Sequence, residues 1–166
     1  MNIRNWPMDQ IMQLPDCCFG TRWPVSCGVT SSAVIDQFTI VKTGLPDRCV
    51  LWELLVLVKS EMAQLFQVEF AWGDQLPPDL SAWNQLQKMF PCQGVQDASN
   101  YYWEGGGHGD LALRRLRMPS PASGQRPCMR VDKTSTAEYM VTAIFVVSSF
   151  PTEVPDWLIS EYRRSR

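Results

Sequence analysis

The only histidine of the chain, His108, stands between two glycines in the stretch YYWEGGGHGD (101–110), close to Glu104 and Asp110. An imidazole titrates near neutral pH and a carboxylate can orient it, so these residues could form a general base or part of a metal site. The flanking glycines argue against both, because a catalytic base must be held by a rigid backbone. We therefore predict no catalytic residue in this stretch.

Other arrangements that could do chemistry are incomplete. Zinc sites use closely spaced pairs such as Cys-x-x-Cys, whereas the only tight pair among the six cysteines is Cys17–Cys18. The glycines between 105 and 109 lead into a predicted strand and not into a helix, so they do not form a phosphate-binding loop. Glu53 and Glu69 could face each other across two strands, but a separate solvent-facing position for each is favoured. The sequence predicts no enzyme, no metal and no cofactor.

Composition and charge narrow the class of partner. Hydrophobic residues make up 45% of the 166 residues and charged residues 19%, which is below the roughly 25% of ordinary soluble domains and favours burial against other subunits. A net charge of −2 provides no field that would attract nucleic acid. The longest apolar run, around 51–58, is shorter than a membrane span. We expect a protein made in a cytoplasm, with its cysteines as thiols, that binds neither nucleic acid nor membranes.

The hydrophobic pattern divides the chain into three predicted parts. Residues 1–30 carry prolines at positions 7, 15 and 24 and no sustained period, which predicts an irregular N-terminal arm. Residues 31–150 are predicted to form the β-sandwich domain. Residues 151–166 are predicted to be a C-terminal tail with one or two closing helical turns, because Asp156 lies near its start and arginines lie at its end.

Within the middle part, most segments show strand patterns. The predicted strands are 32–44, 48–60, 63–74, 111–118, 127–134 and 137–150. The period of two in 63–74 places Val68 and Phe70 inside and Gln67 and Glu69 outside. One short amphipathic helix is predicted within 76–90, capped by Asp79 or Ser81.

The stretch 91–110 has no such period and is predicted to be a long loop. These strands, with one short helix and no alternation of strand and helix, predict a mainly β fold. We expect an antiparallel β-sandwich or jelly-roll with an extended N-terminal arm and long loops.

Aromatic residues in the arm, loop and tail are the candidate contact residues. Aromatic side chains bury a large area for few frozen torsions, which makes them good anchors for a partner. The predicted partner-binding residues are Trp6, Phe19, Trp23, Tyr101, Tyr102, Trp103 and Trp157. A sugar platform at Tyr101, Tyr102 and Trp103 is the alternative, but a subunit interface is favoured because these segments lack clusters of Asn, Asp and Gln.

The order of segments resembles that of a known class of protein. It runs from an aromatic-rich arm (LPDCCFGTRWPV) to a strand pair (DRCVLWELLVLVKSEMAQLFQVEFAW), a long loop and a late apolar strand (EYMVTAIFVVSSF). This organisation resembles small structural proteins of tailed-phage virions, in particular capsid decoration or cement proteins with β-sandwich cores. The resemblance implies a virion protein, made in the host cytoplasm, that forms a homo-oligomer and docks on a major capsid or other virion protein.

Three functions stay open from the sequence. A structural virion protein is favoured, a lectin-like carbohydrate-binding β-sandwich is the alternative, and an enzyme of unrecognised type is the third. For the first we expect a homo-oligomer, a dimer or a trimer. We also expect that deletion of residues 1–24 weakens attachment to the partner more than it weakens the fold.

Overall fold

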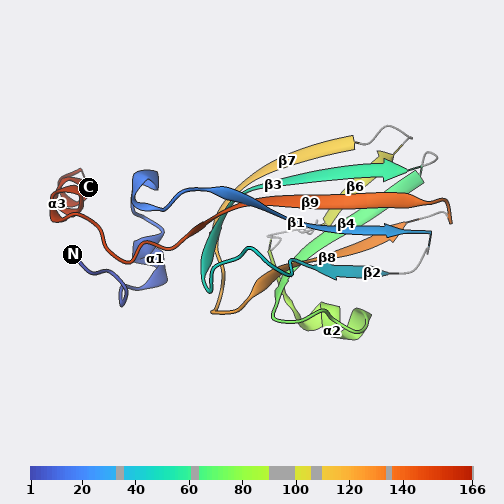
Figure 1. Cartoon of the computed structure of the whole chain (residues 1–166), viewed down its shortest axis with the longest axis horizontal. Coiled ribbons are helices and arrows are strands. Elements are labelled where there is room, and N and C mark those ends of the chain that lie inside the picture. Colours follow the sequence, from blue (N-terminus) through green and yellow to red (C-terminus); the bar gives the residue numbers. More distant parts are fainter. Residues whose placement is uncertain (33–35, 61–63, 90–99, 106–109, 134–135, 166) are drawn as a thin grey trace.

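The chain folds into two antiparallel sheets packed face to face (Figure 1). The computed structural model describes residues 1–32, 36–60, 64–89, 100–105, 110–133 and 136–165, and for 64–66, 100–105, 110–114, 133 and 162 it describes the backbone. In this part of the chain the first sheet has the order β1 (Trp23–Ser31), β9 (Tyr139–Ser149), β3 (Cys49–Ser60) and β7 (Asp110–Pro119). The second has the order β2 (Gln37–Ile40), β8 (Arg126–Lys133), β4 (Gln64–Gly73) and β5 (Gln87–Lys88), with β6 (Asn100–Gly105) also paired to β4. The predicted β-sandwich is confirmed.

Alternate residues of both sheets fill the space between the layers. Val68 and Phe70 of β4 are fully buried there, and Val141 and Phe145 of β9 meet them from the opposite sheet. The rings of Phe70 and Phe145 meet edge to face with centroids 5.8 Å apart. The period of two in β4 therefore marks the inner face as predicted, since side chains alternate along a strand.

Two strands lie where the sequence predicted irregular structure. β1 occupies the last third of the predicted arm and pairs with β9 along its whole length, from Trp23 opposite Val147 to Ser31 opposite Tyr139. It is an edge strand in the sheet order, where a proline such as Pro24 is tolerated. β6 lies within the stretch that was predicted to be a loop and pairs with β4. Both strands are held by partners distant in sequence, which a local pattern does not reveal.

The described helices are short. α2 (Leu80–Gln85) is the predicted helix, and the Asp79 carboxylate caps it by accepting a hydrogen bond of 2.8 Å from the Ala82 backbone N–H. α1 (Met8–Ile11) and the 3₁₀ turn η1 (Asp16–Cys18) lie in the predicted arm. α3 (Asp156–Arg164) is the helix predicted in the tail, with arginines in its last turn.

The two ends of the chain meet in a second, smaller cluster, which we call the terminal lobe (residues 1–20 and 150–165; Figure 1). The Ile3 N–H donates to Thr152 O at 3.1 Å and the Val154 N–H donates to Met1 O at 3.1 Å. The buried members of this cluster are Ile3, Ile11, Leu14, Phe19, Val50, Trp52, Val154 and Ile159. Val50 and Trp52 come from β3, so the lobe also covers one end of the first sheet.

The terminal lobe changes the expectation for the arm. An extended arm would leave its apolar side chains to a partner, but here the chain's own tail and β3 cover them. Deleting residues 1–24 would uncover Val50, Trp52 and Ile159 and should therefore also destabilise the fold. The expectation that it weakens attachment more than the fold stays a prediction. The division into 1–30, 31–150 and 151–166 stays a prediction.

Candidate functional site

A pocket of about 300 Å³ opens where the terminal lobe meets the first sheet. The pairing of β3 with both neighbours shifts at a bulge between Leu51 and Glu53. Trp52 is an extra residue against β9, whereas two residues of β7, Leu116 and Arg117, stand opposite Trp52. Trp52 and Glu53 therefore both lie on the side of the sheet that faces away from the sandwich core. The residues that line the pocket are Asp16, Arg22, Trp52, Glu53, Arg115, Leu116 and Arg117.

Trp52 forms the floor of this pocket. Its Nε1 donates a hydrogen bond of 2.8 Å to Ser148 Oγ, and Phe19 packs edge-on against its ring at 5.2 Å. The guanidinium carbon of Arg22 lies 3.8 Å from the ring centroid, in cation–π contact. The ring is thus covered from within the chain and is not a free platform for a sugar.

Charged contacts tie the terminal lobe to the edge strand β7 across this pocket. The Asp16 carboxylate forms ion pairs with Arg117 at 2.8 Å and with Arg22 at 3.3 Å. Arg117 Nη2 also donates to Leu14 O at 2.8 Å and to Met12 O at 3.2 Å. The ion pairs are partly exposed and contribute little stability by themselves, but they fix the position of the lobe. We interpret the pocket as a joint between lobe and sandwich.

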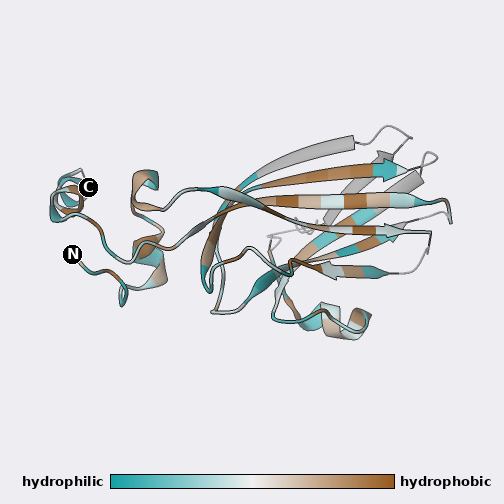
Figure 2. Cartoon of the chain, viewed as in Figure 1, coloured by the Kyte–Doolittle hydropathy of each residue, from teal (hydrophilic) through white to brown (hydrophobic). Residues whose placement is uncertain are grey.

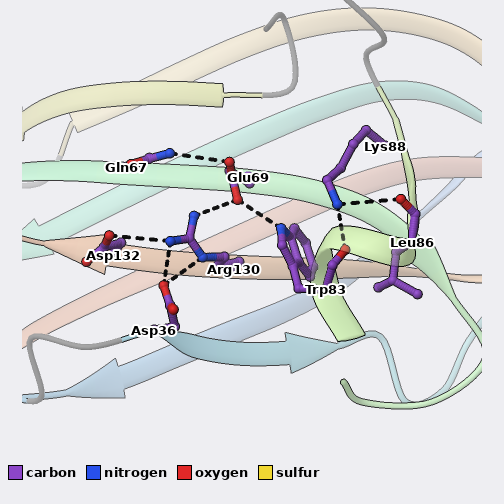
Figure 3. A network of polar contacts seen from close by, with 8 residues as sticks. All are labelled: Asp36, Gln67, Glu69, Trp83, Leu86, Lys88, Arg130 and Asp132. Atoms are coloured by element: carbon purple, nitrogen blue, oxygen red, sulfur yellow. Dashed lines mark hydrogen bonds and ion pairs between the residues drawn. The ribbon is translucent and has the colours of Figure 1, made fainter. Parts of the chain in front are cut away.

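A second polar cluster lies on the outer side of the second sheet, beneath α2 (Figure 3). Glu69 Oε2 accepts hydrogen bonds from Arg130 Nη1 at 2.6 Å and from Trp83 Nε1 at 2.9 Å. Arg130 also binds Asp36 Oδ1 at 2.6 Å. Burial opposes the charge of Arg130, but the carboxylates of Glu69 and Asp36 outweigh it and raise the pKa of the guanidinium.

This cluster corrects the prediction for Glu69. The sequence favoured a solvent-facing position, but α2 covers the carboxylate and Arg130 neutralises it. Glu53 lies in the other sheet and lines the pocket, so the two glutamates do not form a carboxylate pair. Because each polar group of Glu69 is used to bind Arg130, Trp83 or Gln67, we interpret the cluster as a support for α2.

The predicted partner-binding aromatics divide by exposure. Phe19 is buried in the terminal lobe, and Trp6 is half-buried there with the Arg163 guanidinium 5.8 Å from its ring. Trp23 packs against the sandwich core and donates its Nε1 hydrogen to Gly44 O at 2.8 Å. Trp157 on α3 is 64% exposed. Trp157 is thus the most exposed of these four, and the partner-binding role of each of them stays a prediction.

The remaining predicted residues lie in or next to β6. Tyr101, Tyr102 and Trp103 belong to this strand, opposite Val68, Gln67 and Phe66 of β4, and their side chains lie outside the described part of the chain. His108 also lies outside the described residues. Their predicted roles therefore stay predictions.

Metal ligands, thiols and apolar helices are the remaining features of the described residues that bear on function. They contain no group of three His, Cys, Asp or Glu that could hold a metal ion. No helix among them is long and apolar enough to cross a membrane. Cys17, Cys18, Cys27, Cys49 and Cys128 are free thiols, and burial raises the pKa of Cys27 and of Cys128 to about 12. Such buried thiols stay protonated at neutral pH and are poor nucleophiles.

Sequence reasoning missed one further surface, the outer face of the first sheet. Leu57 of β3 is 36% exposed on this face, although it belongs to the long apolar run of the predicted strand 48–60. The apolar run itself indicated this surface. A strand with one face in the core needs only every second residue to be apolar, so a continuous apolar run also places apolar residues on the outer face.

Comparisons with known proteins yield two weak structural likenesses. The chain matches no protein-family model and no curated protein. It is similar to the coat protein of Tobacco streak virus with a TM-score of 0.38 and 6% identity, over 81% of this chain and 90% of that chain. It is also similar to a protein of Bacillus endospore appendages, described as a family of disulfide-linked pili, with a TM-score of 0.33 and 10% identity over 82% and 97% of the two chains. Scores this low carry no argument about function.

Proposed function

We propose that the chain is a non-enzymatic structural protein of a virion, a capsid decoration or cement protein that stabilises a shell by self-association and by docking of its terminal lobe. The observation that carries the proposal is the 64% exposure of Trp157 on a lobe that both ends of the chain build together. The partner of this docking would be a major capsid or other virion protein, in a homo-oligomer made in the host cytoplasm.

The terminal lobe presents Trp157 in a fixed position. Ile159, two residues further along α3, is 2% exposed and anchors the helix in the lobe, and Leu158 packs against the same cluster. The joint formed by Asp16 and Arg117 holds the lobe to the sandwich. A tryptophan held in this way loses little further freedom on binding, which is the property of an interface anchor.

The class of partner comes from the organisation of the chain. The resemblance to small structural proteins of tailed-phage virions agrees with a β-sandwich that carries a separate contact lobe. The lectin-like alternative rests on Tyr101, Tyr102 and Trp103, whose side chains lie outside the described part of the chain, so it stays a prediction.

The proposal is tested with virion shells purified from the natural source of the chain. Trp157→Ala should lower retention on sedimented shells at least about tenfold, because truncation of a buried interface tryptophan commonly costs about 2 kcal/mol or more. Leu76→Ala is the matched control, because Leu76 is 49% exposed and lies outside the terminal lobe. Equal retention of Trp157→Ala and wild type, or absence of the chain from purified virions, overturns the proposal.

A further inference from the structure

The outer face of the first sheet carries an apolar band with a charge at each end. The outward-facing residues of β3 after the bulge are Glu53, Leu55, Leu57 and Lys59, in this order along the strand. The inward residues between them, Leu54, Val56 and Val58, are buried in the sandwich core. Figure 2 shows the result as a strand β3 that is hydrophobic along most of its length.

The neighbouring strands extend this band sideways. On β9, Ile144 lies opposite Leu55, Thr142 opposite Leu57, and Met140 opposite Lys59, each only half-buried. On β1 the next positions are Ser26, Gly28 and Thr30, which are small and exposed. The face is therefore apolar at its centre and has no large side chain on its β1 side that would hold another sheet away.

An apolar outer face is unusual for an antiparallel sheet that faces water. Such sheets normally alternate apolar residues inside with polar residues outside, and strands that are apolar on both sides are typically buried on both sides. The terminal lobe covers the outer side of β3 only at Val50 and Trp52. From Glu53 onward, no described segment is packed over the outward residues of β3.

We propose that this face binds the same face of a second copy of the chain. The two copies are related by a two-fold axis that lies between their first sheets and runs perpendicular to the strands. Such an axis reverses the strand direction of the partner. It places Glu53 over the partner's Lys59, Lys59 over the partner's Glu53, and the leucines of the two copies against each other. A two-fold axis along the strands would instead place Glu53 over the partner's Glu53 and Lys59 over the partner's Lys59, so the order of charges along β3 favours the first arrangement.

On β3, the charges at the two ends are not used within the described chain, although the exposed Arg115 of β7 lies opposite Glu53 on the same face. Neither Glu53 nor Lys59 forms an ion pair or a hydrogen bond through its side chain with another described residue. Lys59 is exposed and Glu53 is half-exposed at the rim of the pocket. In the proposed dimer, Glu53 of each copy would form an ion pair with Lys59 of the other copy, which gives two ion pairs for each interface.

The size of the free face sets the expected affinity. From Glu53 to Lys59 and across four strands it measures roughly 20 Å by 14 Å, from about 3.3 Å per residue and about 4.8 Å between strands. This is a small interface, and we expect a dimer that dissociates on dilution. The inference deepens the self-association in the proposed function and does not depend on the terminal lobe.

Sedimentation velocity over about a hundredfold range of protein concentration tests the dimer. Wild type should shift from monomer to dimer, and Leu57→Lys should raise the dissociation constant at least about tenfold by placing two lysines in the apolar band. Leu76→Lys is the matched control, because Leu76 is a similarly exposed leucine outside this face and should leave the dissociation constant unchanged. A monomeric wild type, or a Leu57→Lys variant that dimerises like wild type, overturns the inference.

A charge exchange tests the direction of the two-fold axis. Glu53→Lys and Lys59→Glu should each weaken the dimer about tenfold, because each places like charges together at both ends of the interface. The double variant Glu53→Lys/Lys59→Glu restores opposite charges and should dimerise within about threefold of wild type. If the double variant is no better than the single ones, the proposed axis is wrong.

The outcomes separate this inference from the proposed function. If Leu57→Lys dissociates the dimer but the wild-type protein does not bind shells, the proposed interface stands and the virion role is wrong. If shell binding requires Trp157 but neither Leu57→Lys nor the charge exchange changes self-association, the virion role stands and the proposed interface is wrong.

Discussion

Arg130 Nη1 lies 2.6 Å from Glu69 Oε2 beneath helix α2, in a contact that joins strand β8 to its neighbour β4. The same carboxylate oxygen accepts the Trp83 Nε1 hydrogen bond from α2, so one ion pair positions the helix on the sheet. The sequence contains both charges but no indication that they meet, because 61 positions separate them.

Removal of Arg130 should destabilise the fold strongly. Arg130→Met leaves Glu69 as a buried charge with no cation, and we expect a loss of about 3–5 kcal/mol in the free energy of unfolding by urea denaturation. The double variant Arg130→Met/Glu69→Leu removes both charges and should recover part of this loss. A loss within about 0.5 kcal/mol for Arg130→Met, as for an ordinary surface substitution, would contradict a buried pair.

Gly44 should be less tolerant of a side chain than Gly124. Both have a positive φ, +86° and +76°, at which any other residue is strained. A Cβ at Gly44 would lie 2.9 Å from Val25 Cγ1, whereas a Cβ at Gly124 meets nothing within 4 Å. We expect Gly124→Ala to cost about 1 kcal/mol and Gly44→Ala clearly more, measured by chemical denaturation. Equal costs would show that Val25 can move aside.

The terminal lobe should behave as part of the fold. Ile3 is fully buried, and Ile3→Ala should lower the free energy of unfolding by about 2–4 kcal/mol in a single cooperative transition. Leu80→Ala is the control, because Leu80 is 41% exposed on α2 and its loss should stay within about 0.5 kcal/mol. If Ile3→Ala leaves the free energy of unfolding unchanged, or if the lobe unfolds in a separate, earlier transition, residues 1–20 are an arm that is independent of the fold.

Stability should fall at alkaline pH because of the buried thiols. The pKa of Cys27 rises from 9.0 to about 12 in the folded chain, mainly through burial. The contribution of Cys27 is therefore fully present below about pH 9 and is lost as the pH rises toward 12, since the unfolded chain ionises first. We expect a slope of up to about 1.4 kcal/mol per pH unit from this thiol. Cys27→Ala should flatten the profile above pH 9 relative to wild type, and an unchanged profile would contradict this contribution.

Much of the fold follows from local patterns in the sequence. The period of two in β4, the apolar run of β3 and the Asp79 cap of α2 are each set by residues next to one another, so their prediction needed no knowledge of what they pack against. Trp157 was likewise predicted as a contact residue from its type and place in the tail, and that role stays a prediction.

Tertiary structure decided the features that depend on distant partners. β1 is a strand because β9 pairs with it, and the predicted arm is a lobe because residues 1–20 meet residues 150–165. Glu69 is buried because α2 and Arg130 cover it, whereas Leu57 is exposed because nothing in the described chain lies over it. Hydrophobic periodicity reports which face of a strand is apolar, but what covers that face depends on residues brought together only by the fold.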